Sequence, residues 1–114
     1  MEEFASIGKI VHPYVHRKAT ESIEVKGDTL DNLVSDFQLQ PGFIKIDVEG
    51  AEYWVLEGAQ NTIKVHHPVI VLELNALLLS SCGTTTQMVL NYLERLHYRF
   101  IPTSDGYVCL PLPP

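Results

Sequence analysis

The residues of this chain best suited to chemistry are Asp47 and Glu49, two carboxylates one residue apart. They follow the apolar run Phe43–Ile46 and precede Gly50, after which the sequence favours a helix. This pattern predicts a buried strand whose carboxyl end opens into a turn and a helix. Ligands of open α/β sheets bind at that edge. Asp47 and Glu49 are therefore the first candidate active-site residues.

A second strand pattern also ends in a carboxylate. The segment 69–74, VIVLEL, is a continuous apolar run rich in β-branched residues, and Glu73 stands near its end, before Asn75. Runs of this kind are typical of parallel strands that are covered on both faces. We predict a strand over residues 69–74.

Helical patterns separate these strands. Asp28 and Thr29 are both good N-caps, and the apolar residues at helical spacing after them predict a helix of about ten residues that stops at Pro41-Gly42. Its apolar stripe is Leu30, Leu33, Val34 and Phe37. A helix of about ten residues is also expected after Gly50. Glu52 falls in its first turn, where the helix dipole favours negative charge, so its role is interpreted as structural.

The ends of the chain complete the pattern. Residues 23–25 alternate like a half-exposed strand, and a short extended piece is expected at 8–12. Residues 76–83 are interpreted as a connection whose leucines cover the end of the sheet. Thr84-x-x-Gln87 is a capping-box pattern before a helical stripe, and 98–101 and 107–110 are predicted to form a hairpin.

Strands that alternate with helices predict right-handed crossovers and a parallel sheet, here with an antiparallel hairpin at the end. A chain of 114 residues fits one domain, residues 1–114. The fold class is therefore α/β.

Composition excludes several classes of function. Eight basic and fourteen acidic side chains give a net charge of −6, without a basic cluster, so neither nucleic acid nor an anionic membrane is an expected partner. No apolar run approaches the roughly 20 residues of a spanning helix, and no secretion signal is present. Cys82 and Cys109 are expected to be reduced thiols, the location cytoplasmic, and no metal-ligand spacing is recognisable.

Several segments in this order resemble the second half of the FkbM-type methyltransferase domain, whose members are S-adenosylmethionine-dependent enzymes with a Rossmann-like fold. The matching segments are Asp28–Leu33 (DTLDNL), Phe43–Glu52 (FIKIDVEGAE), Val55–Ala59 (VLEGA) and Val71–Leu74 (VLEL). They place the resemblance over about residues 23–110, which leaves residues 1–22 as an N-terminal extension.

The resemblance implies that residues 43–47 and 69–74 are adjacent parallel strands, the fourth and fifth of the family fold. Asp47 and Glu73 would then share one carboxyl edge, where two carboxylates can orient a substrate hydroxyl, act as a general base or hold a divalent cation. Asp47, Glu49 and Glu73 are thus the expected catalytic residues. The alternative is that Asp47 or Glu49 caps the following helix by accepting backbone N–H groups.

The sequence departs from the family in its cofactor half. The family's glycine-rich turn has no counterpart, because no two glycines here are closer than eight residues. The resemblance implies S-adenosylmethionine as cofactor, with an incomplete site in this chain. The expected function is that of a truncated methyltransferase-family protein, and autonomous catalysis is doubtful. The alternative is a non-catalytic, self-associating binding module derived from that fold.

The missing half would leave the strand at residues 43–47 as an apolar edge, which invites pairing with another chain. Either the N-terminal segment folds over this edge, or two copies or another protein chain pair through it. A homodimer is the commoner solution.

Overall fold

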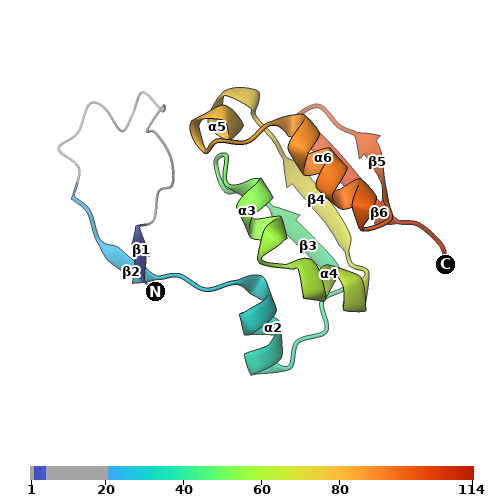
Figure 1. Ribbon diagram of the computed structural model, residues 1–114, viewed down its shortest axis with the longest axis horizontal. Helices are drawn as coiled ribbons and strands as arrows, with labels where there is room; N and C mark the ends of the chain where they lie inside the picture. Colours follow the sequence, from blue (N-terminus) through green and yellow to red (C-terminus); the bar gives the residue numbers. More distant parts are fainter. Residues whose placement is uncertain (1, 5–20) are drawn as a thin grey trace.

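The computed structural model describes residues 2–4 and 21–114. Its main sheet has four strands in the order β3-β4-β6-β5 (Figure 1). Their bounds are Phe43–Ile46 for β3, Val69–Glu73 for β4, Tyr98–Pro102 for β5 and Gly106–Pro111 for β6. β3 and β4 are parallel, whereas β6 is antiparallel to both β4 and β5. The predicted α/β class, with its C-terminal hairpin, is confirmed.

Helices connect the strands and cover one face of this sheet. Between β3 and β4 lie α3 (Glu52–Glu57) and α4 (Gln60–His66), and between β4 and β5 lie α5 (Ala76–Ser81) and α6 (Thr86–Arg95). Figure 1 shows α3, α4 and α6 in front of the strands. The core between the layers contains Ile46, Leu56, Ile63, Ile70, Leu72, Leu79, Val89, Leu93, Tyr98 and Cys109. The described helices include none with the length and apolar character needed to cross a membrane.

The helix α2 (Leu30–Phe37) precedes β3 and is capped as its sequence predicts. The Thr29 hydroxyl accepts a hydrogen bond of 3.1 Å from the Asn32 N–H. Of the apolar stripe, Val34 is buried, whereas Phe37 remains 69% exposed. The stripe is therefore only partly covered in the single chain.

The prediction of a single helix after Gly50 is wrong, since the chain forms α3 and α4 with a break at Gly58 and Ala59. Docking of α2 explains the break. The Asp31 N–H donates to the Gly58 carbonyl at 3.0 Å, while the Asp31 carboxylate accepts the Thr62 N–H at 2.8 Å and so caps α4. Burial raises the pKa of Asp31, but its hydrogen bonds to Thr62 and Asn61 outweigh this effect and lower it overall. A tertiary contact thus ends one helix and starts the next.

Two further expectations require correction. Residues 76–83 contain the helix α5 rather than a plain connection, because the Asn75 side chain caps it by accepting the Leu77 and Leu78 N–H groups. The cap of α6 is Thr85 and not Thr84. Thr84 is buried, and its hydroxyl donates to the Leu79 carbonyl at 3.3 Å, whereas the Thr85 hydroxyl accepts the Met88 N–H at 3.1 Å.

The strand expected at residues 23–25 does not join the main sheet. It is β2 (Glu24–Lys26), which pairs antiparallel with β1 (Glu2–Phe4) in a separate two-stranded sheet. All three residues of β2 are exposed, so this strand does not pack on the core. The extended piece expected at 8–12 lies outside the described residues.

Candidate functional site

The loop after β3 is held by the carboxylate of Glu52. This side chain is 1% exposed and accepts hydrogen bonds from the Val48 N–H at 2.8 Å and the Gly50 N–H at 3.0 Å. Glu49 and Gly50 both have left-handed backbone conformations, with φ of 54° and 105°. These two residues reverse the chain between the strand and α3. Glu52 fixes the reversal by satisfying N–H groups that no helix or strand uses.

The described contacts do not show Asp47 or Glu49 as the cap of the following helix. The carboxylate that accepts the loop N–H groups is that of Glu52. Both Asp47 and Glu49 are exposed, and both line a pocket. Glu52 therefore has a structural role, as expected. It lies in the first turn of α3, and its carboxylate oxygens also accept hydrogen bonds from the preceding loop.

Asp47 and Glu73 lie side by side at the carboxyl edge of the sheet. The parallel register of β3 and β4 pairs Ile46 with Leu72, so the next residue on each strand belongs to this pair. The hydrogen bond to Asp47 and the repulsion between the two carboxylates raise the pKa of Glu73, to which burial and Asp105 also contribute. Lys45 acts in the opposite direction. Two neighbouring carboxyl groups can bind the hydroxyl groups of one ligand through their oxygens.

A pocket of about 220 Å³ opens at this edge. It is lined by Asp47, Glu49, Gly50, Glu52, Glu73, Leu74, Asn75, Leu78 and Asp105. Five of these nine residues carry carboxyl groups and none is basic. The pocket therefore favours neutral hydroxyl-bearing or cationic ligands and disfavours anions.

Asp105 is the member of the pocket that sequence reasoning missed. It belongs to the turn between β5 and β6, and its backbone carbonyl accepts the Leu74 N–H at 2.9 Å. In the sequence this residue carries only a turn signal, Ser104-Asp105-Gly106. The antiparallel pairing of β6 with β4 brings the turn to the carboxyl end of β4, and no local pattern announces that pairing.

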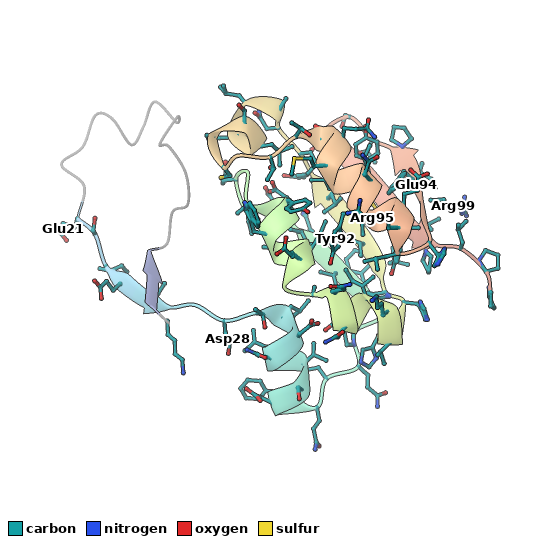
Figure 2. All side chains as sticks on the ribbon, viewed as in Figure 1. Glu21, Asp28, Tyr92, Glu94, Arg95 and Arg99 are labelled. Atoms are coloured by element: carbon teal, nitrogen blue, oxygen red, sulfur yellow. The ribbon has the colours of Figure 1, made fainter. Side chains whose placement is uncertain are left out.

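Lys45 is near enough to act on Glu73, but no basic side chain of the described region lines the pocket. Figure 2 shows Arg95 and Arg99 on α6 and β5, and Arg95 is the last residue of α6, at the end that lies away from α5. The guanidinium of Arg95 lies 5.9 Å from the ring centroid of Tyr92. No group of three or more His, Cys, Asp or Glu side chains among residues 2–4 and 21–114 is arranged to hold a metal ion.

The effect of Asp47 on the pKa of Glu73 can be measured directly. We expect Asp47→Asn to lower the pKa of Glu73, because the substitution removes the largest two causes of its elevation and an amide N–H favours the ionised partner. The measurement is an NMR titration of the glutamate side-chain carboxyl carbons. Asp105→Asn is the matched control and should lower the pKa less. An equal change in both variants would contradict the pairing.

Comparison with known protein families assigns most of the chain to one domain family. A family model, described as the methyltransferase FkbM domain, matches residues 3–100 of the 114-residue chain. No curated protein and no solved structure gave a significant match. The match covers the carboxyl edge with its loop and most of the main sheet. This chain belongs to the FkbM methyltransferase domain family.

Proposed function

We propose that this chain provides the acceptor-binding part of a methyltransferase site and receives a hydroxyl-bearing substrate in the carboxylate pocket. The observation that carries the proposal is the adjacency of Asp47 and Glu73 at the carboxyl edge, inside the pocket. Membership of the FkbM family supports methyl transfer as the reaction class. The proposed acceptor atom is a substrate oxygen.

The carboxylate pair suits an oxygen acceptor. An ionised carboxylate accepts a hydrogen bond from a substrate hydroxyl and can act as its general base, while its neighbour orients a second substrate hydroxyl. Asp47 and Glu73 are assigned these two roles. Glu49, exposed at the rim with its left-handed backbone, is assigned to orient the substrate. Backbone strain of this kind concentrates at functional sites.

S-adenosylmethionine, the cofactor that the family implies, does not fit the described residues. Its carboxylate would need a cation or several N–H donors, yet the lining offers five carboxyl groups and no basic side chain. Its adenine ring would need an apolar slot, for which the lining has only Leu74 and Leu78. Cofactor pockets also commonly exceed about 300 Å³, whereas this pocket has about 220 Å³. No catalytic step through the cofactor is therefore assigned to this chain alone.

The proposal predicts binding of an acceptor without binding of the cofactor. Calorimetric titration with S-adenosylmethionine and S-adenosylhomocysteine, with and without Mg²⁺, should give no signal up to millimolar concentration. In an NMR titration with methyl glucoside, shifts should be confined to the residues that line the pocket. They should disappear in Asp47→Asn and persist in Glu94→Gln, which removes an exposed carboxylate of α6.

The calorimetric titration and the NMR titration can each overturn a separate part of the proposal. Micromolar binding of S-adenosylmethionine would show that the chain holds the cofactor by itself. Identical shifts in wild type and Asp47→Asn would remove the carboxylate pair from acceptor binding.

The cofactor mismatch favours a second candidate function, a non-catalytic binding module that self-associates. Under this alternative the same pocket binds a ligand and no methyl group is transferred. Neither function predicts turnover by the chain alone, so a control assay incubates it with S-adenosylmethionine and methyl glucoside and follows S-adenosylhomocysteine by mass spectrometry. Its formation would exclude the non-catalytic module.

A further inference from the structure

The outer edge of β3 is a strand edge without a neighbour among the described residues. β3 ends the order β3-β4-β6-β5, and within residues 2–4 and 21–114 it pairs with β4 alone (Figure 1). An edge strand presents a row of N–H and C=O groups that can pair with a strand of another chain. The main sheet has one other edge, β5.

The register of β3 shows which backbone groups point outward. The Val69 N–H donates to the Gly42 carbonyl at 2.9 Å, so Gly42 faces β4. Backbone groups of successive residues alternate in direction along a strand. Ile44 and Ile46 therefore also face β4, whereas Phe43 and Lys45 direct their N–H and C=O groups away from the sheet.

The side chains of β3 divide in the same alternating way. Phe43 is 61% exposed and Lys45 is exposed, and both lie on the sheet face opposite the helices. Ile44 is half-buried and packs against the core beneath the helices. The edge thus offers an aromatic ring and a cation on one face, and an aliphatic side chain on the other.

We propose that two copies of this chain pair antiparallel through β3, with Ile44 opposite the partner's Ile44. Phe43 then lies opposite the partner's Lys45, and the reciprocal pair forms by symmetry. Because Phe43 and Lys45 direct their backbone groups outward, each such pair exchanges two hydrogen bonds. The lysine stem covers the exposed ring, and the ammonium group interacts with its face. The two Ile44 side chains extend the core from one copy to the other.

Charge disfavours one neighbouring register. Moving one strand by two residues would place Lys45 opposite the partner's Lys45, and like charges directly opposite are destabilising. The edge strand β5 is protected instead, since Pro102 has no N–H to offer and Arg99 is exposed beside it. A symmetric pair through β3 uses the same patch twice, as two-fold dimers do.

The oligomeric state of the full chain tests the proposal. Sedimentation across the micromolar range should give twice the 12.8 kDa mass of one chain. Phe43→Lys should raise the dimer Kd about tenfold or more, because two cross-strand pairs become like-charged. The double variant F43K/K45E should restore the dimer by reversing the pair.

Ile101→Lys is the matched control, since it places a lysine on an exposed residue of the other edge strand and should leave the Kd unchanged. A wild-type monomer would overturn the proposal, and so would an unchanged Kd in Phe43→Lys or a failure of F43K/K45E to restore pairing.

Cross-linking tests the register independently. In a Cys82→Ser background, Ile44→Cys should form an intermolecular disulfide on mild oxidation, because directly opposed residues have Cβ atoms about 5 Å apart. Phe43→Cys should cross-link much less, since its own copy in the partner lies two positions away. The remaining native thiol, Cys109, is buried. Equal or reversed cross-linking would contradict the register.

Discussion

Replacing Gly50 by alanine should lower the free energy of unfolding by about 3 kcal/mol or more. Gly50 has a φ of 105°, and an added Cβ would collide with the backbone carbonyl of Leu78. A left-handed conformation costs an L-residue about 1–2 kcal/mol, and overpacking adds about 1–3 kcal/mol. The obstruction is backbone at the first helix after β4, so a change of rotamer cannot relieve it. Urea denaturation followed by the fluorescence of Trp54, the single tryptophan, measures the loss.

Gly83→Ala is the control that separates strain from collision. Gly83 also has a positive φ, 79°, but an added Cβ there would meet nothing within 4 Å. It should lose only the conformational part, about 1–2 kcal/mol. Equal losses in both variants would mean that the approach of Gly50 to Leu78 is not a tight contact in solution.

Glu52→Ala should destabilise the protein by about 3 kcal/mol, because it leaves two loop N–H groups without their acceptor. An unsatisfied buried donor costs about 1–3 kcal/mol. Glu52→Gln should lose less than alanine, since one oxygen remains to accept while the amide N–H₂ opposes the second donor. Thermal unfolding of both variants gives the comparison.

Glu57→Ala supplies the control for this prediction. It makes the same substitution at an exposed residue of the same helix and should change stability by less than about 0.5 kcal/mol. A Glu52→Ala variant as stable as Glu57→Ala would show that the loop does not depend on its buried carboxylate.

Local patterns in the sequence were sufficient for the strands of the main sheet and for two helices, α2 and α6. The apolar runs that contain β3 and β4 predict strands, because a short apolar run between turn signals is typical of a strand. The spacing of Leu30, Val34 and Phe37 likewise predicts α2, and Thr29 marks its start. The long segment FIKIDVEGAE carried the family assignment, which the family model confirms.

The candidate site was predictable only in part. Asp47 and Glu73 follow or end apolar runs, so a parallel pairing of those runs is enough to bring them together. Glu52 and Asp105 had purely structural interpretations, because a carboxylate in a first turn or in a hairpin turn is common and specifies no partner. The catalytic assignment of Asp47, Glu49 and Glu73 stays a prediction.

The sequence by itself determined the apolar strand before Asp47, the turn at Gly50 and the family to which both belong. These features depend on residues close together in the chain, where periodicity and glycine positions act directly. Tertiary structure alone decided that α2 would break the helix after Gly50 and that the β5–β6 turn would close the pocket. Each of these depends on contacts between segments far apart in the chain, for which no local spacing exists.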